Sequence, residues 1–468
     1  MQNKGVSYGD LRLSSSQIES ITVKNSELRE LQMVQDSGMN LRVFVDGSWG
    51  FASIEKIDLK KALKAVDQAI DRAKAFSGKN HSGLELVFEP VHIDEWHTPY
   101  IIHPFSVPLE EKLGLLFKVN SLLRSHSMIG VASANMRFKE EKKVFANTEG
   151  SFIRQTLLSS GGGMQAIAIG HGDVQVRSYP MSFRGQFKSG GYEVILGLEM
   201  EKHCIPLRKE AVALLTAPLC PRKKTDIILG KGQMVLQIHE SVGHANELDR
   251  VLGWEADFAG RSFNKIEHLG KFQYGSPIVN LLADTTAPSG LATFGYDDEG
   301  VMAQRFYVVK DGIFQNYFTT RDTAAFIGAN RSNGCSRAQN WRFCPITRIP
   351  NLSLLPGKES LEEIISSTDE GIFMDYNKSW SIDQWRLNFQ FGCEIGWIIK
   401  GGKIRGMVKN PTYQSITPEF WNSCTAIGDH QSWDLIGVIN CGKGQPIQVA
   451  QMSHGCSPAR FQNIQVGV

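Results

Sequence analysis

The chain has no run of about 18 consecutive apolar residues, the length that a membrane-spanning helix needs. Its first ten residues, MQNKGVSYGD, lack the apolar core of a secretory signal peptide. Lys and Arg number 50 against 48 Asp and Glu, so no excess of one charge sign predicts a nucleic-acid or membrane partner. These absences favour a cytoplasmic protein that binds neither.

Cysteine is also sparse, with eight residues in a chain of 468 and no C-x-x-C pair. In a chain of this length, scattered cysteines indicate free thiols in a reducing compartment rather than a disulfide framework. The stretches SSGGGMQ and LGKGQ lack the strand–loop–helix context and the lysine placement of a phosphate loop. Nucleotide binding is therefore not predicted.

The apolar periodicity predicts an α+β protein that begins with a mixed αβ region. Residues 1–82 carry a hairpin signal at Asp46-Gly47 and helical spacing over LKKALKAVDQAIDRAKAF, and they end in the polar break SGKNHSG. A middle region, 83–220, has a helix over VPLEEKLGLLFKVNSLLRSH. It continues as paired strands, with turns expected at Glu140-Glu141 and at 147–150.

The remaining residues, 221–468, follow the proline- and charge-rich segment PLCPRKKTD and read as a strand-rich domain. RFYVVKDGIFQNYF and GWIIKGGKIRGMV each place Asp-Gly or Gly-Gly between apolar runs, which is typical of hairpins. The acidic run Asp297 to Glu299 predicts a solvated turn rather than a cation site.

One segment of this domain, VLQIHESVGHANELDR, carries the pattern H-E-x-x-x-H from His239 to His244. In a regular helix residues i and i+5 lie about 140° apart, so the two imidazoles would not converge on one ion. A π distortion, with i→i+5 hydrogen bonds, would bring them together. Gly243 adds the backbone freedom for such a distortion. The pattern is therefore compatible with a metal site on a distorted helix, or with two histidines that only cap a helix or bond to core carbonyls.

A catalytic zinc takes three protein ligands and a water, so a third ligand is needed. The histidine pattern alone does not determine which residue is the third ligand. Candidates near the motif are Glu247, Asp249 and His268, and candidates near the C-terminus are Cys441 and Cys456. Arg342 and Arg348 are candidates for donating a hydrogen bond to the tetrahedral intermediate or for binding the carboxylate of a peptide. Either arginine could instead form a surface ion pair.

Several segments together resemble the TldD/PmbA family of metalloproteases, on its TldD side. They are FANTEG, IHESVGHANELDRVLG, YDDEG, PITRIPNLSLLPG and VINCGKGQ, preceded by the strand region that starts at LRLSSS. The resemblance implies a zinc site formed by His239, His244 and Cys441, with Glu240 as general base. It also implies a homodimer, or a heterodimer with a PmbA-like subunit that lacks the histidine motif.

The same resemblance implies cleavage of unfolded or linear peptides, in peptide maturation or in turnover of small proteins. An extended peptide could bind by adding a strand to a sheet edge, which would exclude folded substrates. Two other hypotheses remain at this point. The chain could be a non-catalytic peptide-binding subunit with a remnant metal motif, or a cysteine hydrolase that uses Cys441 with a histidine.

Overall fold

The computed structural model describes residues 5–77 and 84–468. Within these residues, eight strands of the N-terminal half form one sheet in the order β3-β2-β1-β5-β6-β4, and β7 and β8 also pair with β6. The sheet contains strands from both sides of residue 82. The strands are β1 (Tyr8–Lys24), β2 (Glu27–Val45), β3 (Ser48–Ile54), β4 (Ile93–His97), β5 (Ile129–Asn147), β6 (Phe152–Gly170), β7 (Asp173–Tyr179) and β8 (Gln186–Ser189).

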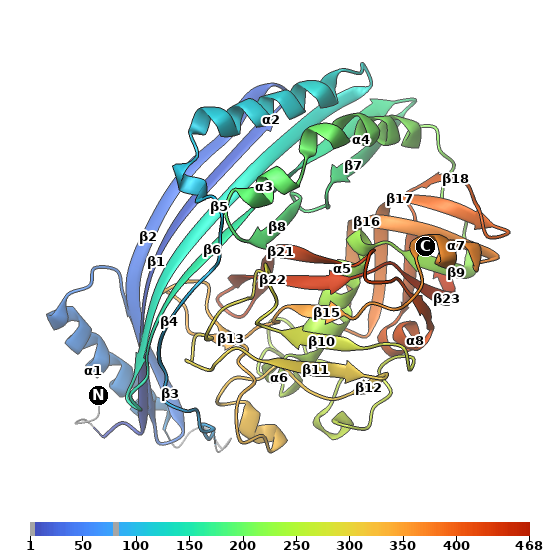
Figure 1. The fold of residues 1–468 in the computed structure, drawn as a ribbon. Coiled ribbons are helices and arrows are strands. Elements are labelled where there is room, and N and C mark those ends of the chain that lie inside the picture. The colour runs from blue at the N-terminus through green and yellow to red at the C-terminus, as the bar shows by residue number, and fades with distance from the viewer. Residues whose placement is uncertain (1–4, 78–83) are drawn as a thin grey trace.

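Helices cover the convex face of this sheet, and the C-terminal region lies on its concave side (Figure 1). The predicted helices are present as α1 and α2, and the apolar stripes of α2 and α4 share a buried cluster with the sheet. The Asp58 carboxylate caps α1 by accepting the backbone N–H of Lys61 at 3.0 Å. The helical segments here are α1 (Leu59–Phe76), η2 (Pro104–Ser106), α2 (Leu109–Arg124), α3 (Glu193–Gly197) and α4 (Met200–Leu214).

Two sheets and a separate hairpin make up most of the described C-terminal region. The larger sheet has the order β16-β9-β23-β19-β17-β18, with β20 on β23, and the smaller has the order β12-β11-β10-β15. β21 and β22 form the hairpin, and the predicted hairpins are present as β11–β12 and β17–β18. The strands are β9 (Lys223–Leu229), β10 (Leu281–Asp284), β11 (Arg305–Lys310), β12 (Ile313–Phe314), β13 (Ser336–Arg337), β14 (Ile346–Thr347), β15 (Leu352–Leu354), β16 (Glu370–Ile382), β17 (Asn388–Lys400), β18 (Ile404–Lys409), β19 (Thr412–Ile416), β20 (Cys424–Ile427), β21 (Asp434–Lys443), β22 (Gln448–Cys456) and β23 (Ala459–Val466).

The segment with the histidine pattern crosses the middle of this region and is buried on all sides. Ile238 and Val242 have no exposed surface and belong to the large apolar cluster of the C-terminal half. The segment thus packs inside the apolar core that the sheets and the hairpin of the C-terminal half form. Its helical pieces, and the others nearby, are α5 (Lys231–Ile238), η3 (His239–Gly243), η4 (His244–Asn246), α6 (Leu248–Val251), η5 (Ile266–His268), η6 (Ala324–Ile327), α7 (Leu361–Ser366) and α8 (Thr417–Asn422).

Two local predictions were wrong, and both concern charged residues. The turn expected at Glu140-Glu141 does not form, because β5 runs straight through both residues in register with β1 and β6. The buried carboxylate of Glu141 is compensated by Lys139 at 2.9 Å and Lys143 at 3.7 Å, so a charged pair is tolerated inside the strand.

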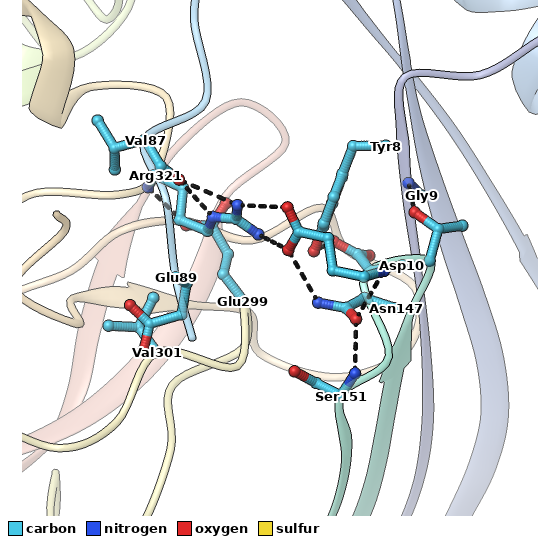
Figure 2. A network of polar contacts seen from close by, with 12 residues as sticks. Tyr8, Gly9, Asp10, Val87, Glu89, Asn147, Ser151, Glu299, Val301 and Arg321 are labelled. Atoms are coloured by element: carbon cyan, nitrogen blue, oxygen red, sulfur yellow. Dashed lines mark hydrogen bonds and ion pairs between the residues drawn. The ribbon is translucent and has the colours of Figure 1, made fainter. Parts of the chain in front are cut away.

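The acidic run 297–299 is a buried turn, not a solvated one. The Glu299 carboxylate accepts from Arg42 Nη1 at 3.0 Å and from the backbone N–H of Arg321 at 2.8 Å. The Arg321 guanidinium donates to the carbonyl of Val87 at 3.0 Å (Figure 2). It also donates to the carboxylate of Glu149, at 2.8 Å. The acidic side chains thus connect the concave face of the large sheet to the C-terminal region, and this pairing explains their burial.

The polar break predicted at 77–83 lies, apart from its first residue, outside the described residues. Among the helices that the structure describes, none is both long enough and apolar enough to cross a membrane.

Candidate metal centre

The helix α5 passes directly into a π turn at the histidine pattern. The backbone N–H of His244 donates to the carbonyl of His239, which is the i→i+5 bond of a π turn. The two imidazoles consequently lie on the same side, with ring centroids 4.8 Å apart and planes at 83°. The predicted distortion of the helix is therefore present.

Gly243 serves this turn by its small size, not by the conformational freedom that the sequence suggested. Its φ of −57° and ψ of −71° lie in the ordinary right-handed region. A Cβ atom at this position would lie 2.7 Å from Cδ1 of the buried Ile349. The absence of a side chain thus lets the π turn pack closely against the chain that leads into β15.

Cys441 approaches the two histidines from β21 of the C-terminal hairpin. One donor atom of each of the three residues lies within 4.8 Å of the other two, and Nε2 of His244 is 3.3 Å from the Cys441 sulfur. The pairing of β21 with β22 is interrupted between Val438 and Cys441, which marks an irregularity in the strand next to the cysteine. All three side chains are buried.

Hydrogen bonds at Nδ1 orient both imidazoles, so that their Nε2 atoms are on the side of the Cys441 sulfur. His454 Nδ1 lies 3.0 Å from the carbonyl of Leu352, an acceptor only, so this nitrogen carries a proton. The Nε2 of a neutral His454 is then an acceptor for Nδ1 of His239, 2.8 Å away. Nδ1 of His244 similarly donates to Glu247 at 2.8 Å. Both Nε2 atoms are thereby left with a lone pair, the form that binds a metal.

The electrostatics of the cluster favour a thiolate at Cys441 beside a neutral His244, while the pKa of His239 is raised, because the Cys441 thiolate outweighs the lowering by burial. Burial alone would raise the pKa of the Cys441 thiol, but the nearby His244, His239 and Arg348 outweigh it and hold that pKa well below its usual range. Burial also holds the pKa of His244 well below its usual value. A thiolate and two imidazole nitrogens are the donors that zinc prefers, so this residue set fits a zinc ion.

Glu240 points into a cleft of about 440 Å³ that reaches the three clustered side chains. Its carboxylate forms an ion pair with Nη1 of Arg386, which comes from the turn between β16 and β17. Phe183 and Trp380 pack edge to face at 5.3 Å on another wall, and both are partly exposed. The cleft therefore combines a carboxylate bound to an arginine with apolar side chains on its wall.

Comparison with known proteins identifies the family. The model of the PmbA/TldA metallopeptidase C-terminal domain matches residues 222–468, and the models of domain 1 and of the central domain match residues 9–75 and 102–217. The chain belongs to the PmbA/TldD family. The three matches follow one another in family order and together cover most of the chain.

Individual members of the PmbA/TldD family give the same result. The chain is 27% identical to a metalloprotease of Methanocaldococcus jannaschii over 86% of this chain and 85% of that protein. It is 26% identical to the metalloprotease TldD homolog of Buchnera aphidicola, over 98% and 92% of the two chains. The crystal structure of TldE from Thermococcus kodakarensis has the same fold, with a TM-score of 0.73 at 16% identity over 100% of this chain and 98% of that one.

The other third-ligand candidates lie elsewhere in this PmbA/TldD member. Glu247 contacts the far side of His244, through Nδ1, and Asp249 binds Lys443 at 2.7 Å. His268 stacks on Phe272. Cys456 is buried near the carbonyl of Lys231, at 3.4 Å, and burial raises the pKa of its thiol. The structure thus brings only Cys441, of these candidates, into a group with both histidines among the described residues.

The two candidate arginines do not reach the cleft. Arg342 forms a partly exposed ion pair with Asp36. Arg348 is buried and donates to the carbonyls of Gln448, at 2.9 Å, and Cys441, so it supports the hairpin that carries the cysteine. Neither lines the cleft, and the alternative of an ion pair holds for Arg342.

Sequence reasoning missed two residues that do lie at the centre, Arg386 and His454. In IDQWRLNFQF the arginine is one cation in an ordinary hairpin turn. His454 lies far from the histidine pattern in sequence, and only the pairing of β22 with β21 brings it to His239. The one feature of the sequence that could have indicated His454 is its position shortly after Cys441, in the same predicted strand-rich region.

Proposed function

We propose that this protein is a zinc-dependent peptidase that cleaves linear or unfolded peptides. The relatives named metalloproteases support a peptidase. The observation that carries the zinc assignment is the buried cluster of His239, His244 and Cys441, with both Nδ1 atoms bound to outer partners. Such a donor set leaves one position of a tetrahedral zinc open for water.

His239, His244 and Cys441 would hold the zinc ion. When bound there, zinc supplies a water of lowered pKa and a Lewis acid for the scissile carbonyl. The residues around the ligands keep them in place: Glu247 accepts from His244, and Lys443 lies 3.4 Å from the same carboxylate. The Glu247 carboxylate thus has a histidine and a lysine as partners inside the protein.

Glu240 acts as general base in this proposal. It follows directly after His239 in the π turn and lines the cleft, so its carboxylate can accept a proton from the attacking water. The same proton then passes to the nitrogen of the leaving amine as the C–N bond breaks. Arg386 holds the carboxylate in the cleft before substrate arrives.

An extended peptide fits the edge of β16. This strand pairs with β17 along its length, but its pairing with β9 on the other side ends at Met374. The stretch 380–382 therefore has one edge without a strand partner among the described residues, and it lines the cleft. Main-chain hydrogen bonds to this edge would bind a linear peptide with little sequence preference and would exclude folded chains.

A dimer, of two copies or with a PmbA-like subunit, is the second part of the proposal. The segment 88–101, around the edge strand β4, exposes Phe88, Val91, Ile93, Tyr100 and Ile101, each at least half exposed. Apolar surface of this kind on an edge strand is typical of an interaction site. Light scattering of the purified protein, alone and mixed with such a subunit, measures the mass of the assembly.

The substitution Glu240→Gln tests the function. We expect it to retain zinc and to abolish cleavage of a denatured protein, while the folded form of the same protein resists the wild-type enzyme. A chelator should also abolish cleavage. Cleavage that survives chelation but is lost on thiol alkylation would favour a cysteine hydrolase. A zinc-loaded wild type that binds peptides but cleaves none would favour a non-catalytic subunit.

A further inference from the structure

The guanidinium of Arg386 binds Glu240 through one nitrogen, and a second nitrogen carries an N–H without an acceptor in the part of the chain that the structure describes. Its Nη1 pairs with the Glu240 carboxylate. Its Nε–H is buried and has no acceptor among the described residues. A buried donor without a partner costs free energy and is uncommon in folded proteins. Since Arg386 lines the cleft, this N–H is available to an oxygen atom of a molecule bound there.

The turn that carries Arg386 is held rigidly. The Asp383 carboxylate accepts the backbone N–H groups of Leu387, at 2.9 Å, and Asn388, at 3.0 Å. The hydroxyl of the buried Thr417 donates to the carbonyl of Arg386 at 2.8 Å. Arg386 itself has a φ of +60°, a conformation that a non-glycine residue keeps only when its surroundings impose it.

This placement suits a group that must be positioned before the reaction. Arg386 lines the same cleft as His239, His244 and Cys441, and only about a sixth of its side chain is exposed, at 17%. A cation held in place beside the reacting group stabilises negative charge, because it needs no rearrangement when that charge develops. A guanidinium can also donate to two acceptors at once from different edges.

We propose that Arg386 is a catalytic residue that donates Nε–H to the carbonyl oxygen of the scissile bond while Nη1 keeps Glu240 in place. When the oxygen of water adds to the carbonyl carbon, the π pair moves onto the carbonyl oxygen and makes it anionic. The proton of the water goes to Glu240, and Arg386 stabilises the new anion. The C–N bond then breaks, and the amine nitrogen takes the proton from Glu240. This inference rests on the proposed peptidase function.

The test compares a transition-state mimic with the substrate. The probes are a fluorescence-quenched linear peptide and a phosphinate peptide, in which a tetrahedral anionic phosphorus group replaces the cleaved bond. Inhibition by the phosphinate is measured in the zinc-loaded wild type and in Arg386→Ala. Binding of the uncleaved peptide is measured with and without the same substitution in the Glu240→Gln protein.

We expect Arg386→Ala to retain zinc, to lower kcat about 100-fold, and to weaken the phosphinate by a similar factor, with little change in substrate binding. Arg386→Lys retains the positive charge but lacks the planar guanidinium with its several N–H donors. It should recover only part of kcat. Arg342→Ala removes an arginine with a partly exposed ion pair outside the cleft and serves as the matched control, with unchanged kinetics.

Four results would overturn the inference. An equal loss of phosphinate and substrate binding would make Arg386 a ground-state contact. A fall in kcat without weaker phosphinate binding would leave it only as a support for Glu240. Loss of zinc in both the Ala and the Lys variants would make it structural. If zinc-loaded wild type cleaves no peptide, the proposed function fails; if it cleaves and Arg386→Ala equals it, only this inference fails.

Discussion

Nδ1 of His239 lies 2.8 Å from Nε2 of His454, and the second imidazole is itself held by the carbonyl of Leu352. The two histidines are 215 positions apart in the chain. This contact decides which nitrogen of His239 faces Cys441, because a proton on Nδ1 leaves the lone pair on Nε2. A residue that touches no metal can therefore determine how well the site binds one.

We predict that His454→Ala weakens zinc binding by about 10- to 100-fold, because His239 loses the acceptor that sets its tautomer and ring orientation. Competition with a chromophoric chelator measures the affinity. His268→Ala is the control, since His268 stacks on Phe272 apart from the cluster. Equal zinc affinity in wild type and His454→Ala would show that the contact does not orient His239.

The number of zinc ions per chain distinguishes the two cysteine candidates. We expect about one zinc per chain in the wild type, near none in Cys441→Ala, and an unchanged value in Cys456→Ala, since the Cys456 thiol lies near the Lys231 carbonyl. Elemental analysis after gel filtration gives the ratio. Zinc that persists in Cys441→Ala would remove this residue from the ligand set.

A single methyl group at Gly243 should disturb the π turn. The Cβ of Gly243→Ala would lie 2.7 Å from Cδ1 of Ile349, and such overpacking costs about 1–3 kcal/mol. Urea unfolding and zinc content should both report the change. Ile349→Val removes the contacted atom, so the double variant should recover part of the loss.

Gly114→Ala is the matched control for that experiment. A Cβ at Gly114, inside α2, meets no atom within 4 Å. Alanine there should be neutral or should raise the free energy of unfolding, by about 0.5–1 kcal/mol. If Gly243→Ala were as well tolerated as Gly114→Ala, close packing would not be the reason for glycine in the π turn.

Local patterns predicted the α+β class, the hairpins with Asp-Gly or Gly-Gly turns, and the distortion of the histidine helix. These features depend on residues that are near one another in sequence, so periodicity and turn chemistry suffice. The distortion could be predicted because two imidazoles at i and i+5 cannot converge on a regular helix.

Long-range pairing could not be predicted in the same way. Arg348 and Arg386 are both isolated arginines in the sequence, yet one binds the carbonyls behind Cys441 and the other binds Glu240. The acidic run 297–299 is polar by composition but buried, because the cations that neutralise it come from strands more than 100 residues earlier. Only the fold determines which partner each charge meets.

Asp298 gives a prediction for stability as a function of pH. Burial would raise the pKa of its carboxyl group, but Lys143, whose Nζ is 3.0 Å away, and Arg12 outweigh burial and lower that pKa. An aspartate in the unfolded chain has a pKa of about 3.9. The stabilisation by Asp298 is therefore complete well above pH ~4 and is lost as the pH falls through the lower pKa of the folded state.

We expect Asp298→Asn to lower the free energy of unfolding by roughly 3 kcal/mol at pH 7, because it leaves Lys143, which is only 18% exposed, less well paired. The difference from wild type should begin to shrink below about pH 4 and should disappear below the lowered pKa of the folded state, where the wild-type carboxylate is protonated as well. Urea unfolding followed by tryptophan fluorescence at a series of pH values measures it. Asp434→Asn, whose ion pair with Lys188 is about one third exposed, should change the stability far less at every pH. A difference for Asp298→Asn that stayed constant with pH would mean that shape, not charge, accounts for the contribution of Asp298.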